Sequence, residues 1–229
     1  MRLAIFDFDG TLFEEQTIPF FMRYYSKHNY PTMPYLNYQL KVFRRIIKYK
    51  NPFIKDYEKE QFRRDAALLF IQIFNGMDKG VLDKFFEEVT ESVIQNLSVP
   101  VVEEVKKCKE SGYYCILLSG CYTPILEKIA EAMGIDAVIG SPIEEKHLCE
   151  GKVTIETLDI VTGKRKVQKL LKLLQGKKVN WQDSIAYGDS VYDRSILELV
   201  GNPVAVRPDT GLEKLAIENK WRIINLQKP

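Results

Sequence analysis

The sequence predicts an α/β fold in which a parallel sheet carries helices on both faces and a helical module is inserted near the N-terminus. After residue 98, apolar runs typical of strands alternate with helical patterns, as in sheets built with crossover helices. Between residues 13 and 97 this alternation stops and only helical patterns occur. The 229 residues are 45% hydrophobic, which suits one sizeable core and a smaller module.

The strands are expected where short apolar runs are bounded by turn residues. In chain order they occupy residues 3–6, 113–118, 137–139, 184–187 and 203–206, with 222–226 as an additional edge. Residues 140–160 are expected to form an extended excursion such as a hairpin.

Two helices of the core have clear sequence signals. In the first, Thr123 suits the N-cap, Pro124 the first helical position and Gly134 the end. Its core-facing residues follow helical spacing: Leu126, Ile129, Ala130 and Met133. The second covers residues 164–175, and its apolar face is expected to contain Val167, Leu170, Leu171 and Leu174. In the inserted module, helices are expected at 19–26, 35–49, 55–74 and 80–96.

Two pairs of carboxylates follow predicted strands. Asp7 and Asp9 come directly after the strand at 3–6, and Asp189 and Asp193 follow the strand at 184–187. Either pair alone is typical of a turn or a helix N-cap. Ligands bind at the carboxyl ends of strands in open α/β sheets, and carboxylates buried there need a partner. A divalent cation and a phosphate would supply that partner.

Two further positions fit an anion-binding site. Ser119 and Gly120 follow the strand at 113–118, and Lys166 lies near the start of the helix at 164–175. A Ser-Gly pair is ordinary loop chemistry and a helical lysine usually faces solvent. However, the two carboxylate pairs, the Ser-Gly pair and the lysine all occur in the same chain, each at the end of a predicted strand or the start of a predicted helix. This combination favours a functional site.

These positions resemble the four motifs of the haloacid dehalogenase superfamily of phosphotransferases. Residues 6–12 read Phe-Asp-Phe-Asp-Gly-Thr-Leu and match the first motif at every position. Ser119 matches the second motif, Lys166 the third and residues 188–193 the fourth. Residues 163–170 resemble the phosphoserine-phosphatase-like branch (subfamily IB), in a register that selects Lys166 as the motif lysine.

The resemblance implies a Rossmann-like catalytic core made of residues 1–12 and 98–229. Residues 13–97 then resemble the helical cap of the family, which closes over the active site, excludes water and selects the substrate.

By the same resemblance, Asp7 is the nucleophile that forms an aspartyl-phosphate, and Asp9 is the general acid and base. Mg²⁺ is bound by the side chains of Asp7 and Asp189 and by the backbone carbonyl of Asp9. Asp193 either supports the water shell of the metal or orients the motif lysine.

The phosphoryl oxygens are held, by resemblance, through the hydroxyl of Ser119 and the charge of Lys166, while Gly120 allows close approach of the backbone.

The substrate prediction departs from the name of the branch. Gln16 stands where phosphoserine enzymes of the branch carry a glutamate, and Leu68 stands where they carry a cap arginine. Arg63 or Arg64 could still reach the substrate. We therefore expect a small or lipid-linked phosphate as substrate and favour it over phosphoserine.

Three alternatives stay open: a phosphoserine phosphatase, a phosphotransferase or phosphomutase that uses another acceptor, and a non-catalytic phosphate-binding module. Asp9 favours a phosphatase or phosphomutase, because the dehalogenases and P-type ATPases of the family lack an aspartate at that position.

A basic, aromatic segment spans residues 20–55. It holds eight Lys or Arg, six Tyr and four Phe, and no Asp or Glu. Three interpretations of this segment are open. Its aromatic side chains could pack inward while its basic side chains face solvent. Alternatively, its charge could attract an anionic substrate, or the segment could contact a membrane surface peripherally.

The remaining composition indicates a cytoplasmic protein. We expect reduced thiols at its four cysteines, with Cys121 either packed or reachable from the site, and no role for His28 or His147. We expect no signal peptide, because strand 3–6 begins at once, and no membrane span. The net charge of +2 by itself indicates nothing about partners. We expect no nucleic-acid partner, and a chain that is a monomer or a dimer.

Overall fold

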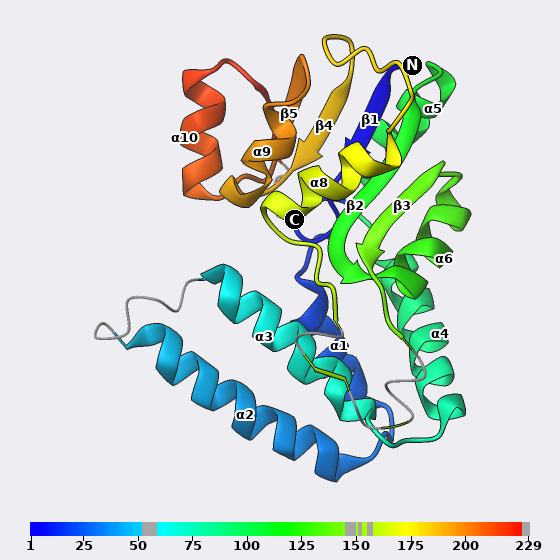
Figure 1. Cartoon of the computed structure of the whole chain (residues 1–229), viewed down its shortest axis with the longest axis vertical. Helices are drawn as coiled ribbons and strands as arrows, with labels where there is room; N and C mark the ends of the chain where they lie inside the picture. The colour runs from blue at the N-terminus through cyan, green and yellow to red at the C-terminus, as the bar shows by residue number, and fades with distance from the viewer. Residues whose placement is uncertain (52–58, 145–149, 151–152, 155–157, 226–229) are drawn as a thin grey trace. The chain divides into compact units, whose positions relative to one another are not determined.

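The chain divides into two compact units, which are described separately. The computed structural model describes residues 1–51, 59–144, 150, 153–154 and 158–225. A core unit comprises Met1–Gln16, Ser92–Ser141 and Val161–Pro229, and a helical unit comprises Thr17–Glu91 and Pro142–Ile160. The predicted α/β core with an inserted helical module is confirmed (Figure 1).

The core unit is built on a six-stranded sheet in the order β3-β2-β1-β4-β5-β6. All pairings are parallel, so the carboxyl ends of the strands lie on one edge. The strands are β1 (Leu3–Phe6), β2 (Tyr114–Tyr122), β3 (Ala137–Ser141), β4 (Ile185–Gly188), β5 (Asn202–Val206) and β6 (Arg222–Ile224). β1 lies between β2 and β4, and a ligand site is expected at the ends of these strands.

β2 is longer than its predicted range of 113–118, because it continues through Ser119 and Gly120 to Tyr122. Its pairing with β3 shifts register between Leu118 and Tyr122, the signature of a bulge. Ser119 therefore lies inside the irregular part of a strand and not in the loop that follows one. At the sheet edge, β6 ends at Ile224, and residue 226 of the predicted edge strand lies outside the described residues.

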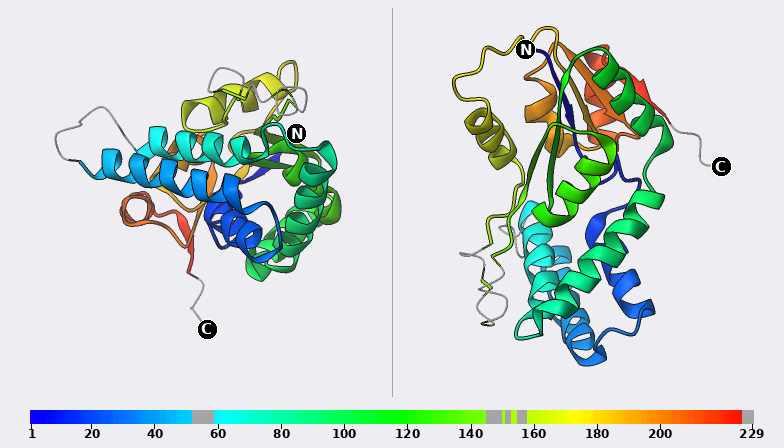
Figure 2. Two further views of the ribbon diagram at one scale, coloured as in Figure 1. Left: turned by 90° about the horizontal axis from the view of Figure 1, so that it is seen from below. Right: turned by 90° about the vertical axis from the view of Figure 1, so that its right-hand side faces the viewer.

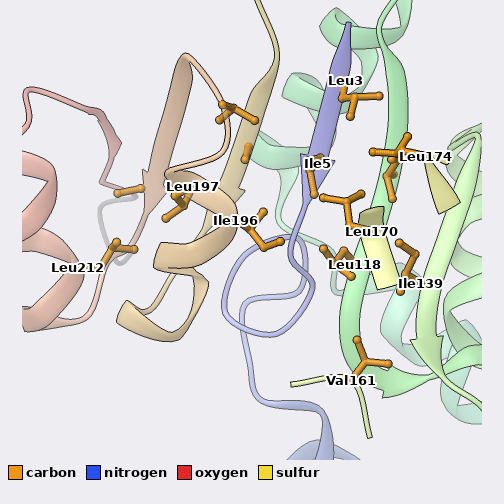
Figure 3. Packing of buried hydrophobic residues seen from close by; sticks show 14 of the residues in the cluster. Leu3, Ile5, Leu118, Ile139, Val161, Leu170, Leu174, Ile196, Leu197 and Leu212 are labelled. Carbon is orange, nitrogen blue, oxygen red and sulfur yellow. The ribbon is translucent and has the colours of Figure 1, made fainter. Parts of the chain in front are cut away.

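Helices cover both faces of the sheet (Figures 1 and 2). One face carries α8 (Lys164–Leu173) and α9 (Arg194–Leu197), and the other carries α5 (Val99–Glu110) and α6 (Thr123–Met133). The core unit also contains η2 (Val191–Asp193) and α10 (Thr210–Glu218). Figure 3 shows the apolar cluster beneath α8, where Leu170 lies among alternate residues of the strands. Each fully buried aliphatic side chain of this kind stabilises the fold by about 1.5–3 kcal/mol.

Two details of the predicted helices are wrong. Leu171 is 48% exposed, because α8 turns Leu173 and not Leu171 toward the cluster with Leu170. At α6 the N-cap residue is Tyr122 and not Thr123, since β2 runs directly into the helix. Gly134 ends α6 as predicted, in the left-handed conformation that favours glycine.

The helical unit has an aromatic core. Its helices are α1 (Thr17–Lys27), α2 (Thr32–Lys50), α3 (Lys59–Ile71), η1 (Gln72–Phe74) and α4 (Lys79–Gln95), the last of which continues into the core unit. The Phe85 ring lies at the centre, with its centroid 5.1 Å from Phe74, 5.8 Å from Phe70 and 6.0 Å from Phe21. Part of the aromatic content of segment 20–55 is thus explained by inward packing.

The boundaries of the helical unit differ from the predicted 13–97. Residues 142–160, predicted to belong to the core, cluster with the helical unit. The side-chain amide of Gln72 there donates to the carbonyl of Val153 at 2.7 Å. The expected hairpin is not present among residues 142–144, 150, 153–154 and 158–160.

The cysteines that the structure describes, Cys108, Cys115 and Cys121, are buried and form no disulfide. Cys149 and His147 lie outside the described residues. None of the described helices combines the length and the apolar character needed to cross a membrane.

A buried carboxylate ties α5 to the sheet. Glu104 accepts hydrogen bonds from Arg222 Nη1 at 2.7 Å, Lys107 Nζ at 3.1 Å and Tyr187 Oη at 2.9 Å. The hydrogen bond from Arg222, aided by those from Lys107 and Tyr187, outweighs burial and lowers the pKa of Glu104 to about 2. Because Tyr187 is on β4 and Arg222 on β6, this one carboxylate links three elements.

Glu104→Gln is expected to lower the free energy of unfolding by about 2–3 kcal/mol at pH 7, because it removes a buried, paired charge. The lowered pKa means that the ionised group stabilises the fold above pH 4.5, and that this contribution is lost as the pH falls from 4.5 toward about 2. Urea denaturation across this range measures it, and the difference between wild type and variant should shrink with the pH.

The matched control is Glu103→Gln, which removes the neighbouring exposed pair of Glu103 and Lys106. This change is expected to cost less than about 1 kcal/mol. Equal losses in the two variants would contradict the role given to Glu104.

Candidate active site

Asp7 lies at the carboxyl end of the central strand. Its backbone N–H donates to the carbonyl of Tyr187 at 3.0 Å, which extends the pairing of β1 with β4 by one residue. Its side chain is buried, with a relative exposure of 10%. The hydrogen bonding of the strand therefore fixes where this carboxylate points.

Lys166 joins Asp7 to a second buried carboxylate. Its Nζ donates to Asp7 Oδ1 at 2.6 Å and to Asp193 Oδ1 at 2.7 Å. All three side chains have relative exposures of 10% or less. The structure thus brings together three residues that the sequence separates by up to 186 positions.

The charges of this cluster determine its protonation. Burial alone would lower the pKa of Lys166, but the carboxylates of Asp193 and Asp7 raise it, so the ammonium stays charged. Burial, together with the nearby charges of Asp193 and Asp189, raises the pKa of Asp7 well above its usual range despite Lys166. One ammonium therefore does not neutralise the cluster.

Asp193 is held by the short helix in which it lies. Its Oδ2 accepts hydrogen bonds from the backbone N–H of Ser190 at 3.4 Å and from the Ser190 hydroxyl at 3.2 Å. This capping box leaves Oδ1 for Lys166. Of the two roles considered for Asp193, direct contact with Lys166 is the one that the structure describes.

Asp189 completes a cluster of carboxylates with Asp7 and Asp193. One oxygen of each lies within 4.8 Å of the others. Oxygen ligands gathered in this way suit a hard divalent cation such as Mg²⁺. Three carboxylates with one lysine leave an excess of negative charge, which a bound cation would balance. The donor set therefore fits the predicted metal, with Asp193 as an additional candidate ligand.

The loop after β1 brings its backbone close to this cluster. The N–H of Phe13 donates to the carbonyl of Phe8 at 2.9 Å, and Asp9 and Phe13 form an isolated bridge. Asp9 is half-buried in this turn. Gly10 has φ +76°, and a Cβ at this position would collide with the carboxylate of Asp189. Gly10 thus serves both the turn and the space for Asp189.

Ser119 and Gly120 lie in the bulged part of β2, beside β1 in the sheet. The hydroxyl of Ser119 is buried and accepts a hydrogen bond from the N–H of Cys121 at 3.0 Å. Ser141, which the sequence analysis missed, donates its hydroxyl to the carbonyl of Gly120 at 2.8 Å and accepts from the N–H of Val161 at 3.0 Å. It thereby fixes the bulge, and its position at the end of β3 could have indicated it.

Arg207 is a second residue that sequence reasoning missed. Its Nη2 donates to the carbonyls of Gly10 and Thr11, both at 2.9 Å, and its Nη1 donates to the Ser98 hydroxyl at 3.2 Å. Its backbone has φ +42°, which is uncommon for a residue other than glycine. Arg207 therefore stabilises the loop after β1 from a turn almost 200 residues away in the sequence. No local sequence pattern predicts this contact.

The three predicted specificity residues are not part of the carboxylate cluster. Gln16 is exposed at the end of the first segment of the core unit. Arg63 and Arg64 are half-buried on α3 of the helical unit. Nε of Arg64 is buried without a hydrogen-bond partner among the described residues.

Comparison with known proteins finds a family and several relatives. The family model described as haloacid dehalogenase-like hydrolase matches residues 4–198. A histidinol-phosphatase of Neisseria meningitidis is 28% identical, and the match covers 99% of both chains. A phosphoserine phosphatase of Mycobacterium tuberculosis is also 28% identical, over 70% of this chain and 51% of its own length.

Solved structures share the fold. A protein of unknown function from Bordetella pertussis has a TM-score of 0.76 at 24% identity, with 98% of each chain covered. A substrate-bound phosphoserine phosphatase has a TM-score of 0.63 at 20% identity, covering 99% of this chain and 94% of its own.

Gly10→Ala is expected to weaken Mg²⁺ binding at least about tenfold, because the added methyl group displaces the Asp189 carboxylate. Isothermal titration calorimetry measures the affinity. Gly112→Ala is the matched control, since Gly112 has φ +74° but open space around the new Cβ. Both variants carry the same backbone strain, of about 1 kcal/mol. Loss of affinity in both would show that strain, and not the collision, is responsible.

Proposed function

The chain belongs to the haloacid dehalogenase-like hydrolase family, and from this premise we propose that it hydrolyses phosphate monoesters with Mg²⁺ through an aspartyl-phosphate on Asp7. The observation that carries the proposal is the buried contact of Asp7 with Lys166, which also binds Asp193. A carboxylate that is held in place and flanked by a fixed positive charge suits attack on an anionic phosphoryl group.

Asp7 is proposed as the nucleophile. One of its oxygens attacks phosphorus, the bond from phosphorus to the leaving oxygen breaks, and the phosphoryl group is transferred to the carboxylate. The buried position at the end of β1 limits the motion of the side chain, so attack in line with the leaving group costs little additional ordering.

Asp9 is proposed as the general acid and base. It lies two residues from Asp7 on the same turn and is half-buried. In the first step it donates a proton to the leaving oxygen. In the second step it removes a proton from the water that attacks the phosphorus of the aspartyl-phosphate, and inorganic phosphate leaves.

Lys166 and the β2 bulge are proposed to hold the phosphoryl oxygens. The Lys166 ammonium supplies a fixed positive charge, the Ser119 hydroxyl supplies a donor, and Gly120, the next residue of the strand, allows close approach of the backbone. The hydrogen bonds made by Ser141 support this arrangement, because they fix the irregular strand that presents Ser119.

Mg²⁺ is proposed to bind through Asp7, Asp189 and the carbonyl of Asp9, with Asp193 within reach of the cluster. When bound, the ion shields the negative charges of Asp7 and the phosphoryl group from each other. The excess negative charge of the cluster, in which Asp7 and Asp193 are buried, supports this assignment.

The substrate proposed is a small or lipid-linked phosphate, in preference to phosphoserine. Gln16 lacks the charge that would pair with an amine, and it is exposed. Histidinol phosphate joins the candidates, because the relative named histidinol-phosphatase matches the chain over nearly its whole length. The helical unit of Thr17–Glu91 and Pro142–Ile160 is the proposed cap that selects among these compounds, in place of the predicted 13–97.

Phosphate release from a panel of monoesters tests the reaction. The panel contains histidinol phosphate, phosphoserine, and sugar, nucleotide and lipid phosphates, each with Mg²⁺ and with EDTA. We expect one class to be favoured, and Asp7→Asn or EDTA to lower its turnover by about a thousandfold or more. Asp183→Asn, which alters an exposed aspartate of the core unit, is the control and should keep full activity.

The outcomes separate the alternatives. Preference for phosphoserine would refute the substrate proposal but leave the reaction intact. Faster release of the leaving group when alcohols are added, with phosphate transferred to them, would identify a phosphotransferase. Turnover that persists in Asp7→Asn would exclude Asp7 as nucleophile.

Asp9→Asn is expected to separate the two chemical steps. With para-nitrophenyl phosphate, whose leaving group needs no proton, Asp7 should still become phosphorylated. Without a base for the attacking water, the intermediate should accumulate. Rapid mixing should then show a burst of about one nitrophenol per protein, followed by slow turnover. Intact mass spectrometry should find one added phosphoryl group. Steady turnover without a burst would assign the base to another residue.

A further inference from the structure

Helix α2 exposes a stripe of apolar side chains. Its members are Met33 (73% exposed), Leu36 (48%), Leu40 (52%), Phe43 (58%) and Ile47 (54%). Alternate spacings of three and four residues place all five on one side of the helix. We call them the α2 stripe. Scattered exposed apolar residues are normal in proteins, but five in register on one helix form a continuous surface.

The α2 stripe is not the face that packs within the helical unit. Tyr38, the buried residue of α2, lies on the other side of the helix, with its ring 6.4 Å from that of Phe70. Arg45 forms an ion pair with Asp65 of α3 at 2.9 Å. Figures 1 and 2 both show α3 running along one side of α2. Inward packing therefore explains Tyr38 and leaves the stripe unexplained.

The borders of the α2 stripe are basic. At 100° per residue, exposed Arg44 and Lys50 border the stripe, each about 60° from its centre on opposite sides. Exposed Lys48 and Lys41 lie farther round the helix on the side of Arg44. No Asp or Glu occurs between residues 20 and 55. An apolar stripe between cationic borders is the arrangement of helices that lie in the interface of an anionic membrane.

We propose that the α2 stripe docks on the surface of a membrane that contains anionic phospholipid. The apolar side chains enter the boundary between headgroups and acyl chains, and the lysine and arginine heads bind lipid phosphates while their stems cover apolar surface. The helix lies in the plane of the interface, because its exposed apolar side chains occupy one side along its length. The inference does not depend on the proposed reaction.

A second copy of the chain fits the α2 stripe less well. From Met33 to Ile47 the stripe is about 21 Å long, and a helix is roughly 10 Å wide, so its footprint of roughly 200 Å² is well below the roughly 800 Å² per partner of a stable interface. Two copies would also bring basic borders together, with no acidic residue of the segment to pair with them.

Co-sedimentation of the full chain with vesicles tests the proposal. Vesicles of phosphatidylcholine with 30% phosphatidylglycerol, roughly the anionic content of many membranes, are compared with phosphatidylcholine alone. We expect at least about tenfold stronger binding to the anionic vesicles, and weaker binding as sodium chloride is raised. The double change Leu40→Gln, Phe43→Gln keeps the charge and should lower the binding about tenfold or more.

Matched controls separate the stripe from general stickiness. Val99 and Ile217 are 70% and 65% exposed on α5 and α10, so Val99→Gln with Ile217→Gln makes the same chemical change elsewhere. This variant should bind like wild type. For charge, Arg44→Gln with Lys50→Gln, which alters the two bordering residues, should weaken anionic binding. Lys128→Gln with Lys172→Gln, on exposed positions of the core unit, should change it little.

Three results would overturn the proposal. The first is equal binding to neutral and anionic vesicles. The second is anionic binding that survives Leu40→Gln, Phe43→Gln. The third is a dimer, seen by sedimentation velocity without lipid, that dissociates in the same variant, because the occupant of the stripe would then be a second copy. Circular dichroism of each variant verifies that the helices are intact.

Discussion

The buried ammonium of Lys166 between Asp7 and Asp193 is the interaction on which the rest of the site depends. Removing three charges from water is costly, and the cost is recovered only when the partners meet at hydrogen-bonding distance. That requirement ties the end of β1, the first turn of α8 and the helix η2 to one point. Removing the Lys166 ammonium would leave both of its buried carboxylate partners uncompensated, a loss of about 3–5 kcal/mol. The sheet supplies the rigidity, since Asp7 continues the ladder of β1 and β4.

Two glycines leave space for the side chains of the carboxylate cluster. At Gly10 any side chain would collide with Asp189, and at Gly188 a Cβ would lie 2.8 Å from the Cβ of Asp193. Two glycines thus admit two carboxylates, and the loop that contains Gly10 is held from outside by Arg207. A site with excess negative charge that must receive an anionic phosphate needs both a cation and a fixed lysine, which is why the carboxylates and Lys166 form one constellation.

Short apolar runs and the turn residues that bound them predicted the strands and the residues at their ends, because these patterns extend over only a few neighbouring positions. The position of Asp7 followed from this, and so did the joint placement of Lys166 and Asp193 through the family resemblance. Contacts set by tertiary packing could not be read in this way. Ser119 proved to lie within a bulge that depends on β3, and Leu171 proved exposed because the sheet selects which residues of α8 it covers. Arg207 reaches a loop 196 residues away through hydrogen bonds that leave no periodic trace.

The helix α2 is a further case in which the sequence pattern alone does not determine which residues are buried. Its sequence contains two apolar faces, one that includes Tyr38 and one that includes Leu40, and periodicity alone does not say which of them the fold covers. The structure assigns the first face to the interior of the helical unit and leaves the second exposed. The charge of the residues that border the second face then indicates which partner could bind it. Basic borders without a compensating carboxylate favour an anionic surface over a second, like-charged helix. Packing within the helical unit thus explains the apolar face that includes Tyr38, and the charge around the face that includes Leu40 indicates what that face binds.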